Sequence, residues 1–405
     1  MKKLSLTLLT VIFLSCTGES QVFNDWRGPD RDGYYPETNL LKEWPENGPE
    51  MKWAFEKLGK GFTSPVIRNG KLYITGMEGD IGHVYIMTLD GELIDKYPYG
   101  IEDSGRYPGT RSTPTIVEDL LYVASGEGEL ICMDLNNGNI KWKRDLFSDF
   151  DSRNIRWGFT ENLIIDGDML FCSPGGKKHN IVALNRHTGR LIWSSEGEGG
   201  LSAYCSPLLI NHNGRKMLVT HMQSNVIALD ARTGRMLWSY PHSNFRNIHP
   251  NTPIYHDNHL YCVSGYGYGG FLLKLSSDGE SVTKVWENST LDPKMGSVII
   301  KDGYIYGSGD RNRRWFCLDW ETGEITYETR DIDKGNVISA EGLLYTYTER
   351  GELALLEPLP GRFRIISQTN ITLGSDQHWA HLVINDGILY VRRGNALMAF
   401  DIRRS

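Results

Sequence analysis

The stretch IALDARTGRMLW, residues 227–238, has a near copy 45 residues earlier in VALNRHTGRLIW, residues 182–193. Each copy has an apolar run ending in Asp or Asn, then a turn ending in Thr-Gly, then a second run that closes on Trp. Asn, Asp and Gly between two apolar runs are the usual residues of a turn between β-strands. The pair therefore predicts a repeated β-hairpin, and recurrence at a fixed spacing indicates a repeat architecture.

A second marker, an apolar–aromatic pair after a turn, counts the repeats. The fourth copy has Val in place of the aromatic residue, and the eight pairs begin at Leu72, Leu121, Leu170, Leu218, Leu260, Ile305, Leu344 and Leu389. The mean spacing is about 45 residues, and each interval holds four short apolar runs. Four strands in each repeat of this length are typical of a propeller blade. The predicted fold is all-β, an eight-bladed β-propeller of four-stranded antiparallel blades.

A strand from the N-terminal region can supply the fourth strand that the last repeat lacks. The last repeat stops at ALMAFDIRRS, residues 396–405, which supplies a third strand and no fourth. MKWAFEK, residues 51–57, places Trp53 where the other repeats have a closing aromatic residue. We expect this N-terminal strand to complete the last blade, because closing the ring removes exposed strand edges. The predicted propeller covers residues 51–405, after an N-terminal extension at residues 17–50.

The first sixteen residues have the composition of a secretory signal. Lys2 and Lys3 precede an apolar run at residues 4–14, which is too short to span a bilayer as a helix. The sequence FLSC that follows resembles the bacterial lipobox, which implies a lipoprotein signal peptide at residues 1–16 and lipidation of Cys16. An ordinary signal with an incidental cysteine is the alternative. The five other cysteines include no CxxC pair, so they predict neither redox nor zinc chemistry.

Composition narrows the possible partners. The net charge is -7, with 43 basic and 50 acidic residues interspersed along the chain. Binding to nucleic acid calls for a basic face, so we predict no nucleic-acid partner. The 44 glycines and 20 tyrosines agree with short strands and tight turns.

The strand order places the linkers between blades on one face of the ring, called the top face here. Where the inner strand of each blade begins, every repeat has a residue that can form hydrogen bonds: Ser64, Thr113, Asn162, Ser206, Thr252, Ser297, Asn336 and His381. These side chains either cap backbone groups at the strand ends or face a bound ligand. The sequence leaves both interpretations open.

Longer linkers on the top face carry candidate ligand-binding residues. Arginine forks and aromatic faces suit carboxylate or sugar ligands, and we predict that such a site uses Arg106, Arg111, Trp157, Glu161, Asn162, Tyr204, Asn251, His378, Trp379 and His381. The candidate catalytic bases are His249 and His381, because an unperturbed imidazole titrates near neutral pH. No metal-ligand pattern is predicted.

Beyond the hairpin itself, longer stretches of the chain resemble a known family. The Asp…Thr-Gly…Trp hairpin resembles the PQQ-like repeat of quinoprotein dehydrogenases and BamB-like lipoproteins. WRGPDRDG (26–33), TENLIIDGDMLFCSPGG (160–176) and HWAHLVINDGILYVRRGNAL (378–397) resemble exported PQQ-like propellers of bacteria. Where such proteins tend to have a histidine entering the sixth blade, this chain has Lys294 and Met295, which weakens any transferred activity.

The resemblance implies a lipid-anchored protein of the bacterial cell envelope, in the periplasm or at the outer membrane. It implies a binding or docking scaffold for an envelope protein, a glycan or a small polar ligand at the top face. The alternative is a quinoprotein-type oxidoreductase, or another enzyme acting on sugars or alcohols, with PQQ and calcium as cofactors. Glu161 and Asn162 could then supply two calcium ligands. No two cysteines are adjacent and no Asp is obviously placed for the calcium, so the sequence favours a protein without enzymatic activity.

Overall fold

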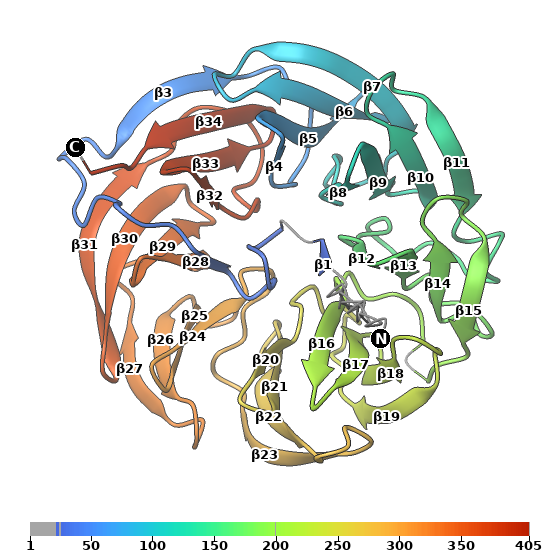
Figure 1. Cartoon of the computed structure of the whole chain (residues 1–405). Helices are drawn as coiled ribbons and strands as arrows, with labels where there is room; N and C mark the ends of the chain where they lie inside the picture. The colour runs from blue at the N-terminus through green and yellow to red at the C-terminus, as the bar shows by residue number, and fades with distance from the viewer. Residues whose placement is uncertain (1–21, 24–25, 199, 405) are drawn as a thin grey trace, which may run out of the picture.

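A computed structural model of the chain describes residues 22–23, 26–198 and 200–404. The predicted signal peptide and Cys16 lie outside these residues. Eight sheets stand around a central channel, each containing four antiparallel blade strands (Figure 1). The prediction of an eight-bladed, all-β propeller is confirmed. Within the described ranges, no helix is long and apolar enough to cross a membrane.

Each blade runs from an inner strand at the channel to an outer strand at the rim. Blades 1 to 4 are β4–β7 (Val66–Arg68, Lys71–Glu78, Ile81–Thr88, Leu93–Ile101), β8–β11 (Thr115–Val117, Leu120–Ala124, Glu129–Asp134, Ile140–Asp145), β12–β15 (Ile164–Asp166, Met169–Cys172, Ile181–Asn185, Leu191–Ser195) and β16–β19 (Leu208–His212, Arg215–His221, Asn225–Asp230, Met236–Pro241). Blades 5 to 8 are β20–β23 (Ile254–His256, His259–Ser264, Gly269–Leu275, Val282–Asn288), β24–β27 (Val298–Lys301, Tyr304–Ser308, Trp315–Asp319, Ile325–Thr329), β28–β31 (Gly335–Ala340, Leu343–Thr348, Glu352–Leu359, Arg362–Asn370) and β32–β34 (Val383–Asn385, Ile388–Arg393, Ala396–Asp401) with β3 (Glu50–Phe55).

The inner hairpins follow the local sequence closely. Asn69 and Gly70 both have positive φ, 50° and 72°, as a type I′ turn requires. Asp302 and Gly303 repeat this with 50° and 80°. Both second strands that follow are buried over most of their length. These turns set the register that puts the apolar–aromatic pairs into the core.

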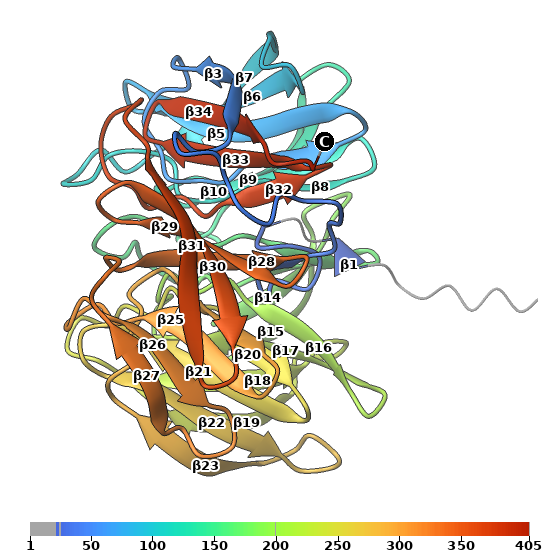
Figure 2. The ribbon, with the colours of Figure 1, turned by 90° about the vertical axis from the view of Figure 1, so that its left-hand side faces the viewer.

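Ring closure is confirmed at the predicted strands. β3 pairs antiparallel with β34, and Trp53 lies opposite Ala399. Figure 1 shows the two strands side by side, and Figure 2 shows the same pairing from the rim. The indole N–H of Trp53 donates to the carbonyl of Leu89 in blade 1 at 2.8 Å. The closing strand therefore also ties blade 8 to blade 1.

The repeated hairpin motif is explained by contacts between neighbouring blades. The closing Trp of one blade donates its indole N–H to a carbonyl in the outer turn of the next blade. Trp142 bonds to Arg186 at 2.8 Å and Trp193 bonds to Ala231 at 3.1 Å. Trp238 is the exception: its indole nitrogen is buried without a partner among the described residues. The turn glycine and the Trp of the motif thus recur together because Trp53, Trp142, Trp193 and Trp286 each pack on the turn glycine of the following blade.

The N-terminal segment before β3 enters the central channel (Figure 1). β1 (Val22–Phe23) pairs with β12, and β2 (Tyr34–Tyr35) pairs in parallel with β28 on the opposite side of the ring. Residues 26–35, predicted as part of an extension outside the blades, therefore lie inside the ring. We call them the channel segment.

Two buried arginines fix the channel segment, and each is 1% exposed. Arg31 donates to the carbonyls of Asn162 at 2.8 Å and Pro207 at 3.0 Å. Arg27 donates to the carbonyls of Val298 at 3.3 Å and Val337 at 3.4 Å. Because these carbonyls belong to four blades, the two guanidinium groups connect the inner strands across the channel.

Candidate functional site

The residues at the start of the inner strands form a hydrogen-bonded collar. All eight are buried, with at most 8% exposure. The Oγ1 of Thr113 accepts from the N–H of Ser64 at 3.2 Å, and the Oδ1 of Asn162 accepts from the N–H of Thr113 at 2.6 Å. The Oγ of Ser206 accepts from the N–H of Asn162 at 2.9 Å, and Ser64 donates its hydroxyl to the carbonyl of His381 at 2.9 Å. The collar thus caps backbone groups of neighbouring blades.

A cup lies above the collar at the start of the inner strands, which is the predicted top face. It is open to solvent and encloses about 1010 Å³ when the space at its mouth is included, which is an upper bound on the room for a ligand. Its wall contains Trp26, Phe62, Tyr107, Trp157, Tyr204, Tyr266 and Trp379. Trp26 belongs to the channel segment and lies 5.4 Å from the ring of His381. The channel segment therefore closes the cup from below.

One regularity along the chain accounts for seven of the residues that line the cup. The residue two positions before each collar residue lies in the linker just ahead of the inner strand. These positions are Phe62, Arg111, Thr160, Tyr204, Pro250, Met295, Lys334 and Trp379, and all of them except Lys334 line the cup. Phe62 and Met295 were not among the predicted ligand-binding residues, and this spacing is the signal in the sequence that indicates them.

The charged lining of the cup is basic. Arg111 donates to the carbonyl of Gly109 at 3.0 Å and lies 3.7 Å from Asp103 outside the cup. The ammonium of Lys294 lies 5.4 Å from the Trp379 ring and 5.9 Å from the Tyr266 ring. No Asp or Glu appears among the described residues that line the cup. An anionic or hydroxyl-rich group is therefore the better complement to this cavity.

Two tyrosines add neutral hydroxyl groups to the wall. Burial raises the pKa of Tyr204 to about 12 and that of Tyr266 to about 12, so both phenols stay protonated. The Tyr204 hydroxyl accepts from the N–H of Trp157 at 3.2 Å. This bond joins the linkers before blades 3 and 4.

The structure brings six of the predicted ligand-binding residues to the cup and places four elsewhere. Those at the cup are Arg111, Trp157, Asn162, Tyr204, Trp379 and His381. Arg106 is exposed and stacks on Tyr107. Glu161 is fully buried below the surface, and Asn251 binds the N–H of Ser297 at 3.0 Å. His378 lies beside Tyr347 in the neighbouring pocket described below.

The two candidate bases occupy different environments. His381 lines the cup, its Nε2 lies 2.9 Å from the carbonyl of Met295, and burial lowers its pKa to about 3. His249 is fully buried outside the cup, where its ring stacks on His221 at 3.8 Å. Burial lowers the pKa of His249 to about 3. Both imidazoles are neutral at physiological pH.

The residues available for a calcium-bound quinone do not fit that cofactor. Glu161 is fully buried and its Oε2 accepts from the N–H of Ser173 at 3.1 Å. The Oδ1 of Asn162 is used by the N–H of Thr113 in the collar. Calcium prefers several oxygen ligands from carboxylates and carbonyls, and the described lining of the cup offers no carboxylate.

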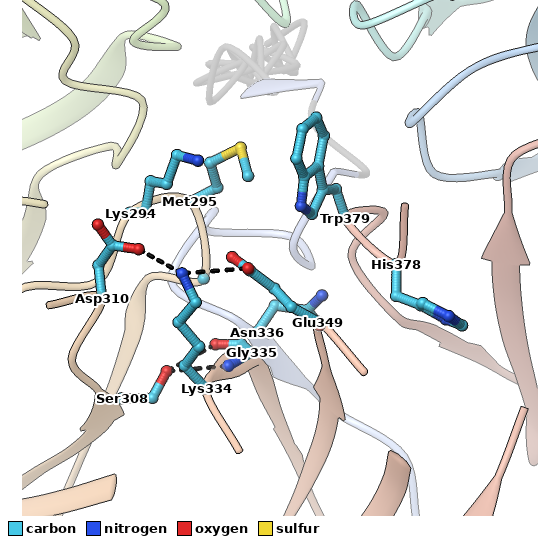
Figure 3. Close-up of a pocket in the computed structure, with 11 residues that line it drawn as sticks. Lys294, Met295, Ser308, Asp310, Lys334, Gly335, Asn336, Glu349, His378 and Trp379 are labelled. Atoms are coloured by element: carbon cyan, nitrogen blue, oxygen red, sulfur yellow. Dashed lines mark hydrogen bonds and ion pairs between the residues drawn. The ribbon is translucent and has the colours of Figure 1, made fainter. Parts of the chain in front are cut away.

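A smaller pocket adjoins the cup at Lys294, Met295 and Trp379 (Figure 3). At its centre, Lys334 binds Asp310 and lies 3.1 Å from Glu349. Its side chain is 10% exposed. Because both carboxylates face the ammonium group, Lys334 is paired within this cluster, and Lys294 and Arg111 are the cations that line the cup.

Eight four-stranded blades, tied by Trp-to-turn contacts and built on the Asp…Thr-Gly…Trp hairpin, define a β-propeller of PQQ-like repeats. The family model described as outer membrane protein assembly factor BamB matches residues 101–329, more than half of the chain. The chain belongs to this family, as the resemblance of its repeats predicted.

Individual relatives align over shorter stretches. The chain is 28% identical over 153 residues to outer membrane protein assembly factor BamB of Kangiella koreensis, and 24% identical over 139 residues to that of Salmonella typhimurium. The alignments cover 36% and 33% of this chain, and 36% and 32% of the two relatives. The chain thus spans about a third of the length of the curated relatives it matches.

Solved structures agree on the fold. The crystal structure of BamB from Moraxella catarrhalis superposes with a TM-score of 0.62 at 16% identity, covering 87% of this chain and 99% of that one. The quinohemoprotein alcohol dehydrogenase of Comamonas testosteroni superposes with a TM-score of 0.66 at 11% identity, covering 95% and 81%. At such identities the likeness shows the propeller architecture alone.

Proposed function

We propose that this chain is an exported envelope lipoprotein that binds a protein or glycan partner through the cup on its top face. One observation carries the proposal: aromatic rings from several separate linkers converge on a single cavity together with Arg111 and Lys294. Such rings cover the apolar faces of sugars and side chains, and rings and arginines dominate the energy of protein interfaces. The two cations complement an acidic or hydroxyl-rich group on the partner.

Family membership supports a place in the cell envelope. The relatives carry the name outer membrane protein assembly factor, and a lipid on Cys16 would hold this propeller at a membrane. The proposal therefore includes lipidation of Cys16 and export across the inner membrane.

The state of the cup histidine favours binding over catalysis. A general base works best when its pKa lies near the working pH, whereas burial lowers the pKa of His381 to about 3. Its Nε2 also lies within hydrogen-bond distance of the carbonyl of Met295. In our proposal His381 holds the linker of Met295 in place and does not act as a base.

Capture of proteins from solubilised envelopes tests whether the partner of the cup is a protein. Immobilised wild-type protein is compared with Trp379→Ala, which removes a half-buried ring from the cup, and with Ile192→Ala. Ile192 is 46% exposed on the outer strand β15 and serves as a control for nonspecific adhesion. We expect at least tenfold less captured partner with Trp379→Ala and unchanged capture with Ile192→Ala. Equal capture by all three proteins would remove the cup from the proposal.

A panel of immobilised envelope glycans tests, with the same three proteins, whether the partner is a glycan. Saturable binding of an acidic glycan that Trp379→Ala abolishes would identify the partner as a sugar. Binding that survives Trp379→Ala would place the glycan outside the cup. In both experiments the melting temperature of Trp379→Ala should stay close to that of the wild type, because the ring is only half-buried.

A further inference from the structure

Three histidines meet beside the cup in blade 4 and its outgoing linker. His221 ends β17, His242 follows β19, and His249 lies near the end of the linker to β20. His221 and His249 are 1% and 0% exposed, and His242 is partly exposed. The cluster is therefore buried, with one member accessible to an ion from solvent.

The geometry of the cluster approaches that of a metal site. The Nδ1 of His242 lies 3.1 Å from the Nε2 of His221. Two nitrogen ligands at about 2.0 Å from a tetrahedral zinc ion lie about 3.3 Å apart. One ring nitrogen from each of the three residues lies within 4.8 Å of the others. The nitrogens of His221 and His242 are thus close to ligand spacing, whereas the ring of His249 stacks on His221 with an interplanar angle of 15° and must turn before it can share an ion.

One ring nitrogen of the cluster, Nδ1 of His221, forms no hydrogen bond with the described residues. His221 is nearly fully buried. This Nδ1 is a different ring atom from the Nε2 that faces His242, so it does not itself mark the position of an ion between the three rings. Both nitrogens of His249 have partners: Nδ1 lies 2.9 Å from the Oγ of Ser264 and Nε2 lies 3.3 Å from the carbonyl of Gln223, so an ion at Nε2 would replace the contact with Gln223 and keep Ser264 as the second polar partner.

We propose that His221, His242 and His249 bind one divalent transition-metal ion of the zinc class, with water as a further ligand. Three imidazoles and no thiolate suit zinc, copper or nickel better than calcium or magnesium. Because the largest nitrogen separation exceeds the tetrahedral spacing, the ion draws the linker of residues 242–249 towards β17. Metal binding and linker closure are therefore coupled.

The linker connects this site to the rim of the cup. It carries Phe245, which is 65% exposed and lies 5.8 Å from the ring of Tyr266 in the cup wall. It also carries Arg246, an exposed site for trypsin cleavage. A bound ion would hold Phe245 beside the cup and protect the Arg246 peptide bond. Only the effect on partner binding rests on the proposed function, whereas metal binding and protease protection do not.

The experiment uses metal-free protein without a polyhistidine tag. Zinc is titrated by calorimetry, and cobalt is titrated with its visible absorption as a report of nitrogen coordination. We expect one ion per chain, at least tenfold weaker binding in His242→Ala, and unchanged binding in His187→Ala. His187 is a matched control because it is 44% exposed and pairs with Asp168 in a turn of blade 3. His242 is the first choice for substitution because it is partly exposed and its loss leaves the core intact.

Tryptic cleavage after Arg246 gives a second readout. Zinc should slow cleavage several-fold in the wild type and in His187→Ala, and should leave the rate unchanged in His242→Ala. Absence of saturable zinc or cobalt binding, or equal affinity in His242→Ala and the wild type, would overturn the metal site. If zinc binds and partner capture does not change, the metal site stands and its link to the cup fails.

Discussion

Trp193 of blade 3 lies directly on Gly234 in the outer turn of blade 4. A methyl group at Gly234 would come within 2.4 Å of Cε3 of Trp193, and the backbone of Gly234 has a φ of +74°. The indole N–H donates to Ala231 in the same turn at 3.1 Å. The conformation of the turn and the packing of the ring therefore both require glycine at this position.

Gly234→Ala should destabilise the protein by about 2–4 kcal/mol, since it combines an unfavourable backbone conformation with overpacking. Gly214→Ala separates the two effects, because Gly214 has a φ of +84° and nothing within 4 Å of an added methyl group. We expect the control to lose only about 1 kcal/mol. Urea unfolding curves of both variants measure the difference, and equal losses would disprove the packing role of Trp193.

Arg31→Ala should cost about 2–4 kcal/mol, because several carbonyls lose a charged donor in a buried site. The affected carbonyls include Asn162 and Pro207 in blades 3 and 4. Arg153→Ala is the matched control, since Arg153 is exposed in a top-face linker and should change stability by less than about 0.5 kcal/mol. Thermal unfolding compares the two variants. A similar melting temperature in both would mean that the channel segment does not stabilise the ring.

Lys334→Met should destabilise the protein by about 3–5 kcal/mol, because it leaves Asp310 and Glu349 facing each other without the buried cation. Arg350→Ala removes an ion pair of the surface type, in which a 72% exposed Arg350 binds Asp333. Such pairs contribute about 0–1 kcal/mol. The denaturant concentration at the unfolding midpoint, measured at neutral pH, should therefore fall much more in Lys334→Met than in Arg350→Ala. A loss below about 1 kcal/mol in Lys334→Met would show that the cluster is solvated.

Glu161→Gln should become more stable than the wild type as the pH rises. Glu161 is fully buried, and burial raises its pKa to about 8, against about 4.3 in an unfolded chain. Between these values the folded state holds a proton that the unfolded state releases. The contribution of this group is therefore complete below the unfolded pKa and decreases by about 1.4 kcal/mol per pH unit up to the folded pKa.

Unfolding midpoints at pH 5 and pH 8 test this sign. The free energy of unfolding of Glu161→Gln, relative to that of the wild type, should increase by about 2–4 kcal/mol from pH 5 to pH 8. Glu321→Gln, at an exposed turn position, should show no such trend. Parallel profiles for Glu161→Gln and the wild type would mean that Glu161 is ionised in the folded state.

Much of the architecture could be predicted because its causes are local. The type I′ turns depend on pairs such as Asn69-Gly70, and the period of the blades follows from them. The closing strand could be found from Trp53, since a propeller with an open edge would leave one aromatic position unfilled. The candidate site was predicted less completely. Phe62 was not among the predicted residues, although it stands two positions before its collar residue Ser64, as Trp379 does before His381.

The sequence by itself determined the number of blades, the strand order within them, the closure of the ring and the face on which the linkers gather. Each of these depends on a pattern that recurs within about 45 residues. Only the tertiary structure placed Arg31 against the carbonyls of Asn162 and Pro207 and brought His221, His242 and His249 together. A backbone carbonyl is the same group in every residue, so the sequence carries no sign of which carbonyl a buried arginine meets. Contacts of this kind are decided by how the blades pack around the channel.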